Sequence, residues 1–415
     1  MERSGEMNAA AGGGDVQNLH IPSMNTTVKV QESRVHIEAS TVAGRLFQRL
    51  FRVLFFVHIV LIAILVVFLA VRGLLSAHSH HFHPKKWYPP LLTATACAGI
   101  VAFTWQWFTF CNPSRALKAA FWLSPLLTCA VLSVTSASPP AKNTTLISLS
   151  IILSTLYSCF LVSGIGGATA VGTVMDTSFI LVILASMSWS MHVMKNTLQV
   201  TVARIKYLHF ASGADLDSRI ALRDTIKYSM GSVIIGSVLV PIITVIRGSA
   251  RAISLIGGGT DEFLFSCADC YSSVAAALVR YGNRWGLVQV GVYNMGFVQA
   301  SMHTWEMLRR VELEPIIDRD LTGSFCFFCG MAGGAICTLV AGTWTFVVHR
   351  SYATEVSIYA FLIGYFMCRI AMAWQQSCVA AYYIAYSESP ENPRLDPNNS
   401  ISHSRISETW SLTII

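Results

Sequence analysis

The chain has 415 residues, of which 53% are apolar and only 12% are charged, and its mean hydropathy is +0.53. Soluble domains are about 45–50% apolar and about 25% charged, so this composition excludes an ordinary soluble fold as well as disordered, collagen-like and small disulfide-rich chains. The excess of 29 Lys and Arg over 22 Asp and Glu indicates basic loops beside a membrane rather than binding to nucleic acid. The sequence therefore predicts an all-α fold, a polytopic bundle of transmembrane helices.

The first 45 residues are polar and mixed in charge, which is typical of a disordered tail. Because Arg45, Arg49 and Arg52 lead directly into the first apolar block, we expect this tail, residues 1–45, to lie in the cytoplasm. The transmembrane domain is expected over residues 46–387. Residues 388–415 are rich in Ser, Asn and Pro and are expected to form a second disordered cytoplasmic tail.

Apolar blocks long enough to cross a bilayer follow one another along the chain. They cover about residues 53–71, 91–110, 117–134, 145–165, 177–209, 229–247, 262–281, 323–348 and 355–386, which makes nine candidates. Block 262–281 is the weakest because it contains Asp269. Block 177–209 is amphipathic in its second half, so one of its faces should meet protein or water.

The basic residues near the blocks give conflicting orientations. The segment after the fifth block carries Arg204, Lys206 and Arg219 and should face the cytoplasm, as should the N-terminal tail. Five crossings separate the two segments, and an odd number places them on opposite sides. Either the first span reverses, one block is not a crossing, or one crossing is missing from the chain.

Four segments carry a resemblance to a known family. Trp189 begins WSMHVMKNTLQVTVAR, Tyr228 begins YSMGS, Tyr281 begins YGNRWGLVQVGVYNMGFVQAS, and Ala381 begins AYYIAYSESPENP. Together, and in this order over about residues 90–390, they resemble the choline transporter-like family in the form found in plants and fungi. The resemblance implies ten transmembrane helices with both termini in the cytoplasm.

The nine candidates fall one short of that number, and the gap lies between Val131 and Thr145. The stretch SVTSASPPAKNTT there resembles the family's cytoplasmic segment before its fifth helix, although it follows the third block almost directly. We therefore expect about one crossing to be absent, which would also resolve the conflict of orientation. The family implies a multi-pass membrane protein, with the plasma membrane as first expectation and Golgi or endosomal membranes as alternatives.

The leading hypothesis is a transporter of choline or a related small organic cation, and not an enzyme. Its partners would be that cation and the lipid bilayer, with no nucleic acid, and the oligomeric state stays open. We expect no catalytic residue, no metal and no cofactor. No sodium-site motif stands out, so facilitated diffusion is expected. The missing crossing favours an alternative, a non-transporting membrane scaffold or regulator.

A quaternary ammonium head has no hydrogen-bond donor, so aromatic faces recognise it, each contributing about 0.5–2 kcal/mol. Polar side chains inside spans are costly unless they face a cavity or a partner. The predicted substrate-binding residues combine both kinds: Trp189, His192, Asn196, Tyr293, Trp374, Gln375, Tyr382 and Tyr383. The alternatives are that the aromatic residues form interfacial belts and that the polar ones bond to neighbouring helices.

Glycines and one amphipathic stretch predict local structure. Gly164, Gly166, Gly167 and Gly172 are expected in an irregular turn at a membrane face. Gly330, Gly333, Gly334 and Gly342 lie within one block and predict a close helix contact or a hinge. The stretch 284–310 is only moderately apolar and is expected to form an amphipathic helix on the cytoplasmic face.

Overall fold

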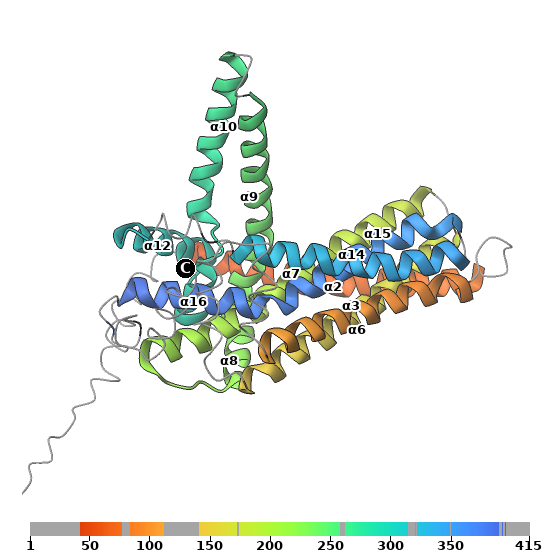
Figure 1. Cartoon of the computed structure of the whole chain (residues 1–415), viewed down its shortest axis with the longest axis horizontal. Coiled ribbons are helices and arrows are strands. Elements are labelled where there is room, and N and C mark those ends of the chain that lie inside the picture. Colours follow the sequence, from red (N-terminus) through yellow and green to blue (C-terminus); the bar gives the residue numbers. More distant parts are fainter. Residues whose placement is uncertain are drawn as a thin grey trace, which may run out of the picture. The chain divides into compact units, whose positions relative to one another are not determined.

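The computed structural model describes residues 42–76, 84–111, 141–171, 174–257, 262–313, 320, 322–348, 350–389, 392 and 395. Every regular element in these ranges is a helix (Figure 1), as expected of an all-α membrane protein. The reason is that backbone N–H and C=O groups in hydrocarbon must bond within their own segment, which a helix achieves. The predicted block 117–134 lies outside the described residues.

The first three described helices pack together through small residues. They are α2 (Val42–Ser76), α3 (Pro84–Cys111) and α6 (Ala141–Val171), and α6 contacts both of the others. A Cβ atom added to Gly167 would lie 2.0 Å from the backbone oxygen of Leu69, so only glycine permits this approach of α6 to α2. The prediction of an irregular turn was wrong for Gly164, Gly166 and Gly167, which lie inside α6, and Gly172 lies outside the described residues.

The helix α7 (Val174–Ser212) contacts α6, α9, α11, α15 and α16. The chain continues through α8 (Ser218–Asp224), a π-helical turn η1 (Thr225–Ser229) and α9 (Met230–Gly257). The α9 helix packs along α10 (Glu262–Tyr281), as Figure 1 shows. Because α7 contacts so many other helices, the polar residues of its second half face protein, as the amphipathic pattern predicts.

Two short helices replace the single amphipathic helix expected over 284–310. The first, α11 (Gly286–Tyr293), is mostly buried and ends at Asn294, whose φ of 53° turns the chain. The second, α12 (Phe297–Arg310), is amphipathic as predicted: it buries Phe297 and Leu308 and exposes Arg309 and Arg310. Its place on a membrane surface stays a prediction.

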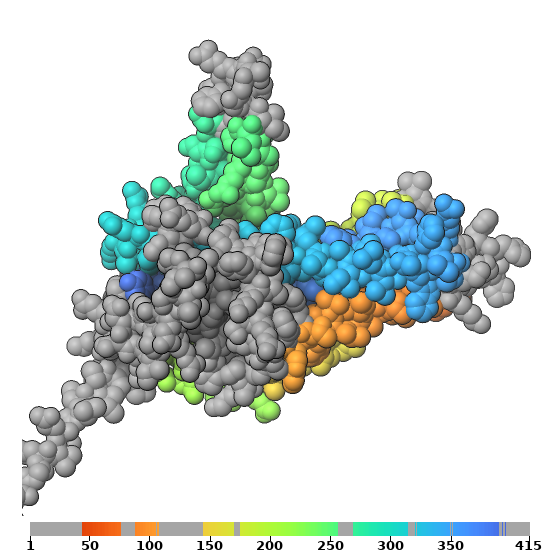
Figure 2. Space-filling model, viewed as in Figure 1, coloured from red at the N-terminus to blue at the C-terminus, as the bar shows by residue number. Residues whose placement is uncertain are grey.

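The C-terminal helices are α14 (Thr322–Val348), the 3₁₀ turn η2 (Arg350–Tyr352), α15 (Ala353–Ala371) and α16 (Ala373–Glu388). Close contact between α14 and α15 was one of two alternatives for the glycines of α14, and the structure confirms it. A Cβ added to Gly333 would lie 2.1 Å from Cys368 Sγ, and one on Gly364 would lie 2.8 Å from the Gly333 oxygen. The surfaces of α14 and α15 adjoin that of α3 (Figure 2).

Six described helical segments are long and apolar enough to cross a membrane. They are Gly44–Leu75, Thr144–Thr169, Met175–Ser212, Ser218–Leu255, Thr322–Val348 and Ala353–Glu388, with a shorter apolar helix at Tyr88–Thr104. Block 262–281 forms α10 but is not among the six. Multiple crossings are thus confirmed, while the absence of one family crossing stays a prediction. Large apolar side chains such as Leu61 and Ile64 on α2 remain exposed, as lipid-facing residues should.

The first described residues after α16 return to α7. Asn392 donates a hydrogen bond of 3.1 Å from Nδ2 to the backbone oxygen of Ala211, and Leu395 is buried. The chain therefore keeps contact with the helical bundle beyond Glu388.

Candidate functional site

Two hollows lie along one face of α7. His192, Lys195 and Gln199 recur at spacings of three and four residues, which places them on the same side of this helix. The first, called here the basic hollow, has a cavity volume of about 10 Å³ and is lined by Met191, His192, Lys195, Tyr365, Phe366 and Arg369. The second, the amide hollow, leaves no room for a water molecule between its side chains and is lined by Gln199, Arg284, Trp285, Asp320, Thr322, Gln376, Val379 and Ala380.

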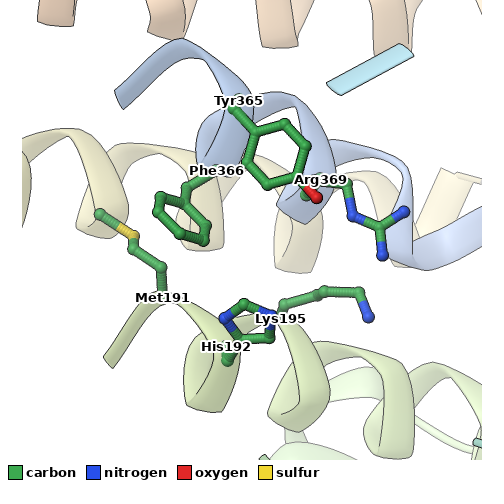
Figure 3. Close-up of a pocket in the computed structure, with 6 residues that line it drawn as sticks. All are labelled: Met191, His192, Lys195, Tyr365, Phe366 and Arg369. Atoms are coloured by element: carbon green, nitrogen blue, oxygen red, sulfur yellow. The ribbon is translucent and has the colours of Figure 1, made fainter. Parts of the chain in front are cut away.

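The basic hollow lies between α7 and α15 (Figure 3). Lys195 from α7 and Arg369 from α15 extend toward one another, with their nitrogen-bearing ends turned to the same side (Figure 3). His192 donates from Nδ1 to the backbone oxygen of Ser188 at 2.9 Å, and its ring stands edge-on to Phe366 at a centroid distance of 5.6 Å. The walls of this hollow are thus aromatic, while one end carries two basic groups.

Positive charge dominates the region around Lys195. Arg369 lines the same hollow, and Arg284, which is paired with Asp320, lies nearby. Asp320 pairs with Arg284 at 2.8 Å and also accepts hydrogen bonds from the Thr322 backbone nitrogen at 3.1 Å and hydroxyl at 2.5 Å. Among the residues that the structure describes, no carboxylate bonds to Lys195 or Arg369, and Arg369 Nη1 is buried without a hydrogen-bond partner.

The amide hollow has a different chemistry. Gln199 Oε1 and Gln376 Oε1 are buried, and neither finds a donor among the described residues. The ring of Trp285 has the Arg284 guanidinium 5.0 Å from its centroid and the Tyr383 ring edge-on at 5.6 Å. Since Arg284 is paired with Asp320, the hollow combines acceptor oxygens and an aromatic residue without an excess of positive charge.

The eight residues predicted from the sequence are distributed over several contacts. His192 lines the basic hollow, and none of the eight is among the residues that line the amide hollow. Trp189 packs against α2, with its ring 5.4 Å from Phe55 and 4.6 Å from His58. Asn196 is buried and donates to the Ser237 hydroxyl of α9 at 3.0 Å.

Tyr293 belongs to a polar network at the end of α16. Its hydroxyl lies 2.8 Å from that of Tyr207 and donates to Glu388 Oε2 at 2.8 Å, and Tyr207 donates to the same carboxylate oxygen. Gln289 Nε2 donates to the other oxygen of Glu388 at 2.8 Å. This network joins α7, α11 and α16 around one carboxylate.

The remaining predicted residues lie on α16. Trp374 and Gln375 are buried, with 4% and 1% of their surface exposed. Tyr382 stands edge-on to Phe210 at 5.7 Å and to Tyr383 at 6.1 Å. Tyr383 does not line the amide hollow, but it packs against Trp285, which does.

The predicted site residues do not include Arg369, Asp320 or Trp285. Arg369 had a usable signal, since it interrupts the apolar run YFMCRIAMAW and a charged residue inside a span marks a functional position by default. Asp320 precedes α14 and gives no such signal, because acidic residues are ordinary outside a span. Only the fold brings it to Arg284.

Comparison with known proteins provides an independent finding. The profile of a family described as plasma-membrane choline transporter matches residues 31–391. Protein pns1 of Aspergillus fumigatus is 24% identical over 244 residues, which cover 55% of this chain and 44% of that protein. Protein PNS1 of Mycosarcoma maydis is 27% identical over 50% of this chain and 43% of that protein. Protein PNS1 of Saccharomyces cerevisiae is 27% identical over 41% of this chain and 34% of that protein. The matched part of the chain thus spans less than half the length of these relatives.

Proposed function

The chain belongs to the choline transporter family, and from this premise we propose that it carries choline or a related small organic cation across a membrane by facilitated diffusion. Its apolar helices already make it a multi-pass membrane protein. We place it in the plasma membrane, as the description of the matching family suggests. Imaging of a tagged chain beside plasma-membrane, Golgi and endosomal markers tests that location.

The chemistry of the amide hollow supports the proposal best, although its side chains must separate to admit choline because they leave no room for a water molecule. A quaternary ammonium group is attracted by aromatic rings and by electronegative oxygens, and Trp285, Gln199 and Gln376 provide both. The hydroxyl group of choline can donate a hydrogen bond to one of the two amide oxygens, and the positive head can interact with the other. A buried acceptor without a donor costs about 1–3 kcal/mol, so a ligand that occupies these oxygens recovers part of that cost.

The basic hollow suits a cation less well. Two unit charges 4 Å apart interact by about 4 kcal/mol at an effective dielectric constant of 20. A cation beside Lys195 and Arg369 would meet repulsion of this order from each group. We therefore assign the cation to the amide hollow. His192, which lines the basic hollow, would lie along the route of the cation and not in its binding site.

Five of the eight residues predicted from the sequence keep a supporting role in this proposal. Tyr383 holds the Trp285 ring from its edge, and Trp374 and Gln375 precede Gln376 on the same helix. Trp189 and Asn196 hold α7 against α2 and α9, so they would fix the helix that carries Gln199. Tyr293 and Tyr382 belong to the contacts at the far end of α16 and are not assigned to the cation.

Labelled choline uptake into liposomes that contain the purified chain tests the proposal. Trp285→Ala should lower uptake about tenfold, since a cation–π contact contributes about 0.5–2 kcal/mol, whereas Trp285→Phe should keep most of it. Trp344→Ala is the matched control because this tryptophan is 46% exposed on α14. A melting curve of each variant confirms that it is folded. Flux equal to that of empty vesicles, while another family member transports under the same conditions, would favour a non-transporting scaffold.

A further inference from the structure

We infer that the basic hollow binds a small inorganic anion, of the chloride class, between the Lys195 ammonium and the Arg369 guanidinium. This site goes beyond the proposed cation transport. It rests on two observations, a pair of facing basic side chains and the lack of any acidic group bonded to them among the described residues.

The chemistry of Arg369 carries the first step. A guanidinium group stays protonated in proteins and has five N–H donors and no acceptor. Nη1 of Arg369 is buried and has no hydrogen-bond partner in the described part of the chain. Arginine inside a membrane helix is costly, and it persists where it meets a counter-charge or a ligand. An anion in the hollow would satisfy both the charge and the unused donor.

The groups around the pair do not supply that counter-charge. Asp320 is engaged by Arg284 and by Thr322, so its lone pairs are largely used. His192 uses Nδ1 for the Ser188 oxygen. The other polar groups that described residues bring to the hollow are His192 Nε2 and the Tyr365 hydroxyl, and neither is acidic. Among the described residues, no acidic group therefore stands between Lys195 and Arg369.

The size of the hollow limits the ligand. The cavity volume is about 10 Å³, which is about the least that holds one water molecule. Phe366 and Met191 form apolar walls that offer no further donors. This arrangement fits an anion of one heavy atom. A consequence that depends on the proposed function is that a bound anion would lower the repulsion of a cation passing along the α7 face.

Thermal unfolding in detergent, without choline, tests the site directly. Chloride replaces gluconate at constant ionic strength and constant cation. A ligand that binds only the folded state at 100 times its dissociation constant raises the free energy of unfolding by about 2.7 kcal/mol, so saturating chloride should raise the Tm by several degrees. Arg369→Gln and Lys195→Met should lose most of that rise. In gluconate, Lys195→Met should melt above the unsubstituted protein, because it removes one of two facing like charges.

Matched controls use basic residues outside the hollow. Lys227→Met and Arg251→Gln, both at exposed positions, should keep the full chloride response. Arg369→Lys preserves the charge and should keep most of it, which covers the case that Arg369→Gln fails to fold. Equal Tm values in chloride and gluconate for the unsubstituted protein would overturn the inference, as would equal responses in all variants.

Two further arms identify the source of the anion and separate the inference from transport. Soluble phosphate and mixed micelles containing phosphatidylglycerol replace chloride in turn, and a response to the lipid alone would overturn a small-anion site. Choline uptake is measured on the same preparations. A rise of the Tm in chloride without choline uptake would overturn the transport proposal and leave the anion site standing. Choline uptake with no rise of the Tm in any of the anions would overturn the anion site and leave the transport proposal standing.

Discussion

The carboxylate of Asp320 accepts a hydrogen bond of 2.8 Å from Arg284, and 1% of the Asp320 side chain is exposed against 29% of the Arg284 side chain. Removing the acid leaves a guanidinium partly buried without its partner, which costs about 3–5 kcal/mol for a fully buried pair. Because Arg284 keeps some contact with solvent, Asp320→Asn should cost about 2–3 kcal/mol. Denaturation of the purified variant in detergent measures this loss.

The matched control is the ion pair of Arg204 and Asp224, whose nitrogen and oxygen atoms are 3.2 Å apart. The Arg204 side chain is 19% exposed and the Asp224 side chain 27%. Asp224 keeps more contact with solvent than Asp320, so Asp224→Asn should cost less than Asp320→Asn. The double variant Asp320→Asn with Arg284→Gln should recover part of the loss. Equal losses for the two aspartates would contradict the importance given to Asp320.

Gln376 should affect stability and uptake in opposite directions. Its Oε1 is buried without a donor, so Gln376→Leu should leave the Tm unchanged or raise it, because an unsatisfied acceptor disappears. The same change should lower choline uptake, because the ligand loses one oxygen. Gln289→Leu is the contrasting control: its Oε1 is also buried without a donor, but the change removes the 2.8 Å bond to Glu388 as well and should lower the Tm. A Gln376 variant that melts early with normal uptake would count against the amide hollow.

The contact between α2 and α6 depends on the absence of a side chain at Gly167. An added Cβ would lie 2.0 Å from the Leu69 oxygen and 2.3 Å from its carbonyl carbon, and these backbone atoms cannot rotate away. Gly167→Ala should therefore destabilise the protein by about 1–3 kcal/mol or more. Gly248→Ala, where no atom lies within 4 Å, should be neutral or stabilising by up to about 1 kcal/mol. Thermal unfolding of both variants, side by side, gives the comparison.

Choline uptake should be driven by the choline gradient and the membrane potential, without a coupled ion. If the chain moves a permanent cation by facilitated diffusion, a more negative liposome interior should raise choline uptake, since 100 mV is worth about 2.3 kcal/mol per charge that crosses the whole membrane. Replacing sodium with potassium outside, at a clamped potential, should leave the rate unchanged. Uptake that requires sodium would overturn the facilitative mechanism.

The sequence predicted the fold class and most helices, because long apolar blocks are decided locally. It was wrong at the glycines of α6, where GIGGATAV suggests an interruption. Each glycine costs a helix about 1 kcal/mol, but here Gly167 and Gly73 allow α6 and α2 to approach closely, and this packing offsets the cost. Such compensation depends on a partner helix that the local pattern does not reveal.

The segments that carry the family resemblance meet in space. The Ser229 hydroxyl of YSMGS donates to Asn294 Oδ1 of YNMGF at 2.9 Å, and Ser232 donates to the backbone oxygen of Met295 at 3.1 Å. These motifs thus build a junction between η1, α9 and the turn after α11. The sequence shows the motifs but not that they bond to one another.

The hollows were less predictable than the helices. The polar face of α7 was visible from spacing, which selected His192 and Asn196, yet one of these lines a hollow and the other bonds to Ser237. The partner residues Arg369 and Trp285 come from distant parts of the chain. Only packing of α7 against α11 and α15 places them along the same face.

The measurement that bears most directly on the account is an electron cryo-microscopy map of the protein in saturating choline. We predict density for a quaternary ammonium group against Trp285, within contact of the Gln199 and Gln376 oxygens. A matching map without choline should lack that density. Side chains that fill the amide hollow in both maps, or choline density beside Lys195 and Arg369 instead, would contradict the assignment of this hollow to the cation.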